Sequence, residues 1–408
     1  MAIPRFTHTQ ILVLAILTLI NFVNYIDRQI IFALVPLIQA DFGLTHLQVA
    51  WLGTVFSFVH SLFTLPLAVL ADRSSRKKII GYGVIVWSAA TFLSGLAASF
   101  RSLLTVRALV GVGEAAYAPA ATATITGSFS RQIRARVQGV FDLGMFIGGA
   151  AGLALGSILG EWVGWRPAFF IVAVPGLLLA LSILRLPEPP VERREKFIPI
   201  RQLLRVPAYV MVLVGGWFIT FAAYSYIFWG TKFVHEYKAF RLRDAGLILG
   251  GTLVVAGILG VLAGAALADR LAQRFPWGRV AVIGIGFLVS APFLFWAFHT
   301  PSKGVFLILF FVGGFFATWY HGPLTATIHD LTPARAHATA IGVYYFFVNF
   351  FATTWAFPII GRVADRHNLL TGMHVAWGAQ VVGALCFFVV AYLIRRHGLH
   401  HPALAHYH

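Results

Sequence analysis

The segment TATITGSFSRQIRARVQGV (residues 122–140) recurs 203 residues later as TATIHDLTPARAHATAIGV (325–343). Seven of the nineteen aligned positions are identical, and they include both ends of the segment. A second pair, LAVLADR (67–73) and GAALADR (264–270), repeats in the same order at an offset of 197. The chain therefore contains two repeats of about 200 residues each.

The composition places both repeats in a membrane. Of the 408 residues, 59% are hydrophobic and 11% are charged, whereas soluble domains carry about 25% charged residues. Twelve apolar segments approach the length that crosses a bilayer, so each repeat supplies six and both run in the same direction. We place the segments at residues 10–38, 47–71, 79–98, 103–127, 137–160, 165–185, 207–234, 245–268, 280–299, 304–328, 338–361 and 371–394.

The longest polar connection divides the chain into two halves. It reads RLPEPPVERREKFIPIRQLLRVP (185–207), and its prolines and mixed charges are typical of a loop. We therefore predict an all-α integral membrane protein with two six-helix bundles related as parallel repeats. Its predicted parts are an N-terminal bundle (1–186), a cytoplasmic linker (187–206), a C-terminal bundle (207–396) and a His-rich tail (397–408).

The loop charges predict the orientation. With the N-terminus in the cytoplasm, 20 lysines and arginines lie on the cytoplasmic side and 8 on the far side, as the positive-inside rule requires. We expect a multi-pass protein of the cell's inner (plasma) membrane with both termini in the cytoplasm. The same loops account for the net charge of +17 without a nucleic-acid partner, because the bases are scattered rather than grouped in one domain.

Two loops carry the same charged motif. ADRSSRKK (71–78) follows the second span of the first half, and ADRLAQR (268–274) follows the second span of the other. They resemble the cytoplasmic loop signature of the major facilitator superfamily, although Ala68 and Ala265 replace its usual glycine. The resemblance implies a charge latch that closes the cytoplasmic side, whereas a plain positive-inside loop explains only the bases. The latch candidates are Asp72, Arg73, Arg76, Lys77, Asp142, Asp269 and Arg270.

Charged residues inside the spans predict the functional site. Each costs roughly 2.5–3.5 kcal/mol at the centre of a membrane helix, so such residues face the protein interior. Asp27 and Arg28 lie in the first span, and Arg107 and Glu114, two turns apart on one face, lie in the fourth. The acids are candidate proton carriers, and the arginine forks match phosphate or carboxylate. Alternatively, these charges are purely structural ion pairs between the two spans.

Helical geometry predicts the directions in which the side chains of Asp27 and Arg28 point. Adjacent residues of a helix point about 100° apart, so we expect Asp27 to face the fourth span and Arg28 to face a cavity or the other half. Asp142, near the end of the fifth span, fits a latch, a helix cap or a transport role equally. His60, in the second span, is either a titrating group or a hydrogen-bonded core residue.

The second half offers neutral and aromatic groups instead. A charged half and an aromatic half suit an amphipathic substrate with a charged head group. The substrate-binding candidates of both halves are Arg28, Arg107, His321, Tyr320, Asn349 and Tyr344. Glycines at every fourth position from 144 to 160 predict close helix packing, which is either static or part of a sliding interface.

A narrower likeness rests on four motifs. They are NYIDR (24–28), TVRALVGVGEAAYAPA (105–120), ADRSSRKK (71–78) and PGLLLALSILRLPEPPVERRE (175–195). With these motifs the chain resembles the spinster family of the superfamily, which implies proton-linked movement of lysophospholipids or sphingoid phosphates. The likeness makes Asp27, Arg28, Arg107 and Glu114 the polar centre and leaves Asp142 outside the family pattern. Symporters of sugar acids share the Asn-Tyr-x-Asp-Arg start and the Arg–Glu spacing.

We therefore predict a proton-coupled secondary transporter of an anionic amphiphile, working by alternating access. The alternatives are a symporter of small organic anions such as sugar acids and a non-transporting receptor or scaffold. No nucleophile triad, phosphate-cradling loop, Walker motif or metal-ligand spacing supports an enzyme, a cofactor or ATP drive. The single cysteine, Cys386, excludes an internal disulfide. The expected partners are the substrate, protons and membrane lipids, with the chain as a monomer.

Overall fold

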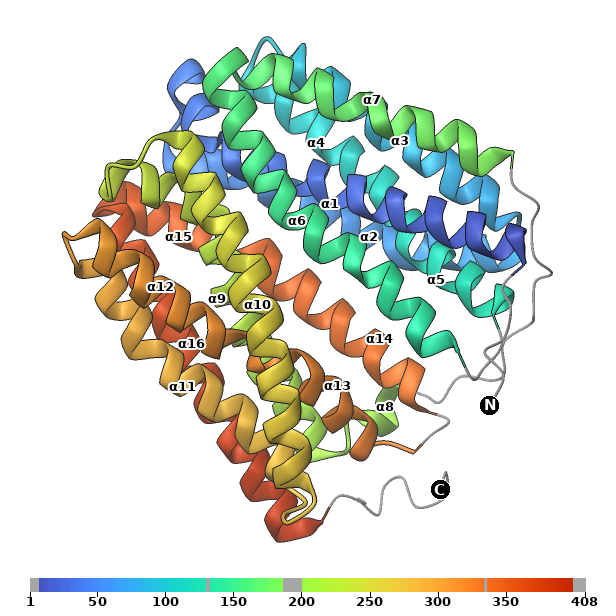
Figure 1. Cartoon of the computed structure of the whole chain (residues 1–408), viewed down its shortest axis with the longest axis vertical. Helices are drawn as coiled ribbons and strands as arrows, with labels where there is room; N and C mark the ends of the chain where they lie inside the picture. The colour runs from blue at the N-terminus through green and yellow to red at the C-terminus, as the bar shows by residue number, and fades with distance from the viewer. Residues whose placement is uncertain (1–6, 130–132, 186–199, 334–335, 399–408) are drawn as a thin grey trace. The chain divides into compact units, whose positions relative to one another are not determined.

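The computed structural model describes residues 7–129, 133–185, 200–333 and 336–398 (Figure 1). Within these ranges every regular element is a helix, so the predicted all-α class is confirmed. The chain forms two compact units, Met1–Arg194 with Ala239–Gly250, and Glu195–Lys238 with Gly251–His408. We call them the N-terminal and C-terminal bundles and describe each by itself.

The N-terminal bundle contains the helices coloured blue to green in Figure 1. They are α1 (His8–Phe42), α2 (His46–Arg73), α3 (Arg76–Gly95), α4 (Phe100–Ala115), α5 (Tyr117–Ser128), α6 (Arg134–Val163) and α7 (Trp165–Leu184). The start of α10 (Leu242–Ala272) groups with this bundle and its remainder with the other.

The C-terminal bundle follows with less regular spans. Its elements are α8 (Ile200–Leu203), α9 (Pro207–Tyr237), most of α10, α11 (Gly278–His299), α12 (Lys303–Ala317), the 3-10 turn η1 (Thr318–Tyr320), α13 (His321–Asp330), α14 (His337–Phe347), the π-helix η3 (Val348–Thr353), α15 (Thr354–Arg366) and α16 (Leu369–His397). Here α16 packs between α9 and α11.

Eleven helical stretches of the described chain are long and apolar enough to cross a membrane. The fourth predicted span, 103–127, is the one not counted among these eleven, and it is present as two shorter helices because the chain breaks at Ala116 between α4 and α5. Pro119 explains the break, since a proline clashes with the carbonyl four residues earlier, here that of Ala115. The tenth span is interrupted in the same way at η1 (Thr318–Tyr320). Here Pro323 clashes with the carbonyl of Trp319, four residues earlier. The twelve-span prediction therefore stands, with two spans in pieces.

Local signals fix the turn between the first two spans. At the start of α1, Thr7 and Gln10 form a reciprocal capping box, and Thr45 and Gln48 form another at the start of α2. Between them, Gly43 ends α1 with φ 61°, a left-handed conformation that favours glycine. The chain therefore reverses within a few residues.

The glycines of α6 allow α1 to lie directly against it. A Cβ atom built on Gly148 would come within 2.3 Å of the Phe22 carbonyl oxygen, and one on Gly152 within 2.7 Å of the Ile26 oxygen. Both contacts are shorter than van der Waals separation and involve backbone, which cannot move aside easily. The stripe therefore fixes the position of α1, the helix that carries Asp27 and Arg28.

Replacing Gly148 with alanine is expected to lower the free energy of unfolding by roughly 1–3 kcal/mol, as overpacking does. Gly139 is the matched control, because it lies in the same helix and a Cβ there meets no atom within 4 Å. Gly139→Ala is expected to be neutral or slightly stabilising. Thermal unfolding in detergent compares the two variants, and equal midpoints would contradict the close packing of α1 on α6.

Candidate functional site

Four helices of the N-terminal bundle bring the predicted intramembrane charges together. Asp27 and Arg28 come from α1, and Arg107 and Glu114 come from α4, while α2 and α3 contribute neighbours. Asp27, Arg107 and Glu114 are at most 1% exposed. Unlike Asp27 and Glu114, the Arg28 side chain retains partial exposure, at 14%. This cluster is the polar centre of an otherwise apolar bundle.

Arg28 forms an ion pair with Glu114. Its Nε and Nη2 atoms donate to the same oxygen, Glu114 Oε2, at 3.0 and 2.7 Å. Nη2 also lies 3.2 Å from His60 Nε2. Because a guanidinium can only donate, that ring nitrogen must accept and His60 is neutral in this arrangement. The Arg28 guanidinium also lies over the rings of Tyr25 and Phe56, at 5.1 and 5.2 Å, so it is held from three helices.

Asp27 points to a different helix from its neighbour. The Thr91 hydroxyl of α3 donates to Asp27 Oδ2 at 2.5 Å. The other carboxylate oxygen has no hydrogen-bond partner among the described residues. Asp27 nevertheless interacts electrostatically with Arg107 and Glu114. The expectation that Asp27 faces the fourth span is therefore corrected in part, since its hydrogen bond goes to the third.

Arg107 differs from Arg28 in its hydrogen bonding. The side chain is fully buried, and none of its three guanidinium nitrogens has a hydrogen-bond partner in the described part of the chain. Its neighbours are the Phe56 ring, 5.0 Å from Cζ, and the charges of Asp27 and Glu114. A buried donor without an acceptor costs about 1–3 kcal/mol, and more when it is charged. Arg107 is therefore the charged side chain of this cluster whose guanidinium nitrogens have no hydrogen-bond partner among the described residues.

Buried hydrogen bonds to the backbone brace the cluster. The Tyr117 hydroxyl donates to the Leu17 oxygen at 2.5 Å, and the Asn21 amide donates to the Phe141 oxygen at 2.8 Å. These bonds tie α1 to α5 and α6 across the bundle. Tyr117 directly follows the break at Ala116. The break therefore ends α4 and also places the Tyr117 hydroxyl where it bonds to α1.

The predicted latch residues lie apart from this centre. The side chain of Asp72 lies outside the described residues. Arg76 is buried, and its Nη1 atom donates to the Ala123 oxygen of α5 at 3.0 Å. Arg73 is exposed and Lys77 half-buried. Asp142 accepts a hydrogen bond from Gln138, one turn earlier in α6, at 3.0 Å.

In the C-terminal bundle, the second charged loop (268–274) lies close to an arginine that the sequence analysis did not single out. Asp269 Oδ1 lies 3.6 Å from Nη2 of Arg279, whereas Arg270 is exposed. Nη1 of Arg279 donates to Asp330 Oδ2 at 2.5 Å, so one arginine of α11 joins α10 to α13. The repeat gives no signal for this network, because the residue 203 positions before Asp330 is Gly127.

The neutral candidates of the C-terminal bundle also gather. Tyr320 and His321 have ring centroids 4.1 Å apart, and those of Tyr344 and Tyr345 are 5.4 Å apart. Tyr344 interacts electrostatically with Tyr320 and Tyr345, which brings the two pairs into one group. Asn349 donates to the Tyr345 oxygen at 2.8 Å and accepts from Thr353 through its own backbone oxygen, inside the π-helix.

Comparison with known proteins identifies relatives over most of the chain. The family model of the Major Facilitator Superfamily matches residues 17–356. An "MFS-type efflux pump" of Mycolicibacterium smegmatis is 27% identical over 93% of this chain and 92% of its own length. The "Probable sphingolipid transporter spinster homolog 2" of Arabidopsis thaliana is 26% identical, covering 81% of this chain and 72% of its own. Several further spinster proteins are longer, and the chain spans 52–64% of their length.

A solved structure shows the same fold. A bacterial homolog of the human lysosomal transporter spinster, in an inward-facing and unoccupied conformation, superposes with a TM-score of 0.86 at 24% identity. The match covers 96% of this chain and 99% of the other. The curated relatives named above are an efflux pump and a probable transporter rather than enzymes, in agreement with the prediction from the sequence.

Proposed function

Because the chain belongs to the major facilitator superfamily and is a spinster-like membrane transporter, we propose that it moves an anionic amphiphile by proton-coupled transport. One observation carries the proposal. Arg107, a permanently charged group, is fully buried, has no hydrogen-bond acceptor among the described residues, and lies beside two buried carboxylates. An anion site and two proton-accepting groups therefore share one cluster.

The ion pair between Arg28 and Glu114 supplies the coupling. While Glu114 is ionised, it occupies both the Nε and Nη2 donors of Arg28. A proton on Glu114 removes the charge that attracts Arg28, so the guanidinium can exchange this partner for another anion. Proton binding and substrate binding therefore act on the same arginine, which is the requirement for a coupled carrier.

An amphiphile is favoured over a wholly polar anion by the second bundle. Tyr320, Tyr344 and Tyr345 are aromatic and uncharged, and they suit an apolar or weakly polar part of a substrate. The sphingolipid named for the Arabidopsis relative supports a lysophospholipid or sphingoid phosphate as the substrate class. Small organic anions such as sugar acids are the second candidate, because an arginine fork binds carboxylate as well as phosphate.

The setting of the carrier is part of the same proposal. The distribution of basic residues supports an inner-membrane location with both termini in the cytoplasm. The charged loops at 71–78 and 268–274 would then lie on the cytoplasmic side. There Asp269 is within 3.6 Å of Arg279, and we retain the latch role for this region. A monomer is the expected transporting unit.

Binding and flux of two ligand classes test the proposal. The purified chain is screened by thermal shift with sphingosine 1-phosphate, lysophosphatidylglycerol, gluconate and galactonate, and then assayed for pH-driven flux in liposomes. We expect stabilisation and flux with the phosphate amphiphiles and neither with the sugar acids. The reverse pattern would establish the organic-anion carrier instead, and flux of neither class at any pH gradient would contradict the proposed substrates.

A further inference from the structure

The imidazole of His60 belongs to the polar centre but has no part in the proton and anion steps proposed above. His60 lies near the middle of α2, and its Nε2 atom accepts a hydrogen bond from Nη2 of Arg28 at 3.2 Å. The same Nη2 atom donates to Glu114 Oε2 at 2.7 Å. One arm of Arg28 is therefore shared by a neutral acceptor and a charged one.

Close packing of α2 on α4 sets the position of His60. Gly111 lies in α4 between Arg107 and Glu114. A Cβ atom built on Gly111 would come within 2.8 Å of the Phe56 oxygen and 3.1 Å of the His60 backbone nitrogen. The Phe56 ring also stacks on the imidazole, with centroids 5.8 Å apart. This turn of α2 therefore lies directly against the segment of α4 that carries both charges.

The surroundings favour a neutral His60. A proton on Nε2 would remove the lone pair that accepts from Arg28, and it would place a second positive charge 3.2 Å from the first. In the described part of the chain, Arg28 is the charged group in contact with the imidazole. The other titratable or charged groups of the cluster are Tyr25 and Asp27 of α1, Arg107 and Glu114 of α4, and Tyr117 of α5. From α3, which also packs against α2, the cluster receives the uncharged Thr91.

We propose that His60 is a positioning residue, which holds Arg28 at the anion site after Glu114 has taken a proton. This inference rests on the proposed function, in which that proton removes the charge attracting Arg28. The Nε2 lone pair of His60 remains available to Nη2 when Glu114 is neutral. Arg28 therefore keeps its direction and meets the anion already ordered. Ordering a long side chain only when the ligand binds lowers affinity, by roughly three- to tenfold.

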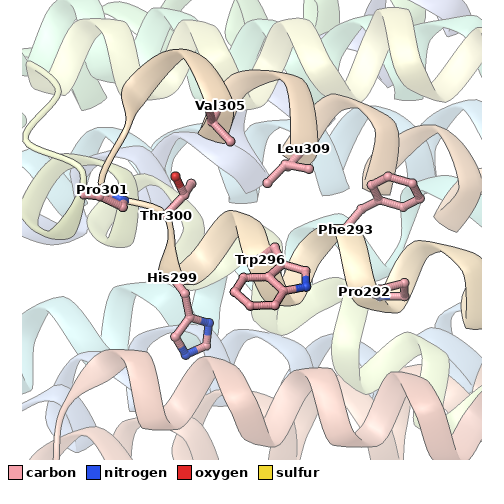
Figure 2. Close-up of a pocket in the computed structure, with 8 residues that line it drawn as sticks. All are labelled: Pro292, Phe293, Trp296, His299, Thr300, Pro301, Val305 and Leu309. Atoms are coloured by element: carbon pink, nitrogen blue, oxygen red, sulfur yellow. The ribbon is translucent and has the colours of Figure 1, made fainter.

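A pocket in the C-terminal bundle lacks such an arrangement. It occupies about 500 Å³ beside α11 and α12, and Figure 2 shows Phe293, Trp296 and Leu309 among the side chains around it. The eight residues that line it include no lysine or arginine, so it has no permanent charge for an anionic head group. The head group is therefore assigned to the polar centre, where the direction of Arg28 matters.

Two substitutions separate the acceptor from the bulk of the ring. His60→Gln keeps a neutral oxygen that can accept from Arg28, whereas His60→Leu keeps an apolar side chain without an acceptor. With sphingosine 1-phosphate as the probe, His60→Leu is expected to weaken binding roughly three- to tenfold at pH 5.5. At pH 8.5 the expected loss is less than about twofold, because ionised Glu114 then holds Arg28. His60→Gln is expected to bind as the wild type does at both pH values.

A second background and a control distinguish positioning from simple packing. In Glu114→Gln, the loss caused by His60→Leu is expected at both pH values, because residue 114 then never carries the charge that substitutes for the histidine. His46→Leu removes an imidazole from the first residue of α2, about 21 Å away along the helix, and is expected to bind normally. An equal loss at both pH values with Glu114 present would overturn the proposal.

Thermal unfolding without ligand tests the same role independently of transport. The midpoint of His60→Leu is expected to lie below that of His60→Gln at pH 5.5, because Nη2 then has neither the histidine nor an ionised Glu114 as acceptor. The gap should close at pH 8.5. His60→Met replaces His60→Leu if the latter does not fold.

The two readouts separate this inference from the proposed function. The expected midpoints without binding of the probe would contradict the proposed substrate and support the role of His60. Equal midpoints and equal affinities of His60→Leu and His60→Gln, together with pH-dependent binding by the wild type, would overturn the role of His60 and leave the transport proposal in place.

Discussion

Replacing Arg107 with alanine is expected to weaken binding of the anionic substrate by roughly a hundredfold or more while the protein remains folded. Binding should weaken because the substitution removes a buried, permanently charged fork. The protein should remain folded because of how Arg107 is hydrogen-bonded. Arg107 donates to no described residue, so its removal breaks no hydrogen bond within the described part of the bundle. Substrate-induced thermal shift and equilibrium binding in detergent measure both parts.

Two further variants separate shape from charge. Arg107→Lys keeps the charge but has a compact ammonium in place of the planar fork, so we expect it to recover little binding. Arg101→Ala removes an exposed arginine six residues earlier in the same helix and is expected to bind normally. Normal transport by Arg107→Lys would mean that the site requires only a positive charge at this position.

The second large effect concerns coupling. Asp27→Asn is expected to reduce pH-driven flux more than tenfold and to keep substrate binding. Asparagine resembles only the protonated acid, and it can still accept the hydrogen bond from Thr91. Binding between pH 5.5 and 8.5 should lose the part of its pH dependence that Asp27 contributes, whereas the part due to the Arg28–Glu114 pair remains in this variant. Flux into liposomes under an imposed pH gradient, compared with flux driven by substrate alone, makes the distinction.

Glu114→Gln is expected to lose coupling as well, with a different signature. The glutamine carries no charge to hold Arg28, so this variant should bind the substrate anion more tightly at high pH than the wild type does. Asp41→Asn, at the end of the same helix as Asp27, removes only an exposed ion pair with Arg166 and should transport normally. Full pH-driven flux in both Asp27→Asn and Glu114→Gln would make the buried charges structural.

The members of the site could be predicted from the sequence, but their pairing could not. Asp27, Arg28, Arg107 and Glu114 stand out because charge is expensive inside a membrane span. Which base each acid meets depends on the rotation of α1 between its neighbours, and no local pattern encodes that rotation. Thr91 is neutral and small, so nothing in its own segment distinguishes it from a core residue, although it donates to Asp27.

For the membrane spans, too, composition predicted where each one lies but not the geometry of its backbone. Apolar length located the fourth span correctly, because hydropathy averages over the whole segment. The break at Ala116 depends on one residue, Pro119, whose missing N–H changes the backbone without changing the hydropathy. In the other bundle, Arg279 and Asp330 escaped prediction because both lie at the ends of apolar segments, where charges are common.

The π-helix at Val348–Thr353 also limits how far the two repeats can remain equivalent. Sequence identity aligns the start of α14 with the start of α6, which continues as an unbroken α-helix to Val163. One additional residue in a turn rotates everything after it by about 100° relative to an α-helix. Positions in α15 that correspond by alignment to the glycine stripe of α6 therefore point in another direction. The two repeats therefore share a sequence pattern at the start of this span but do not share one helix face along its whole length.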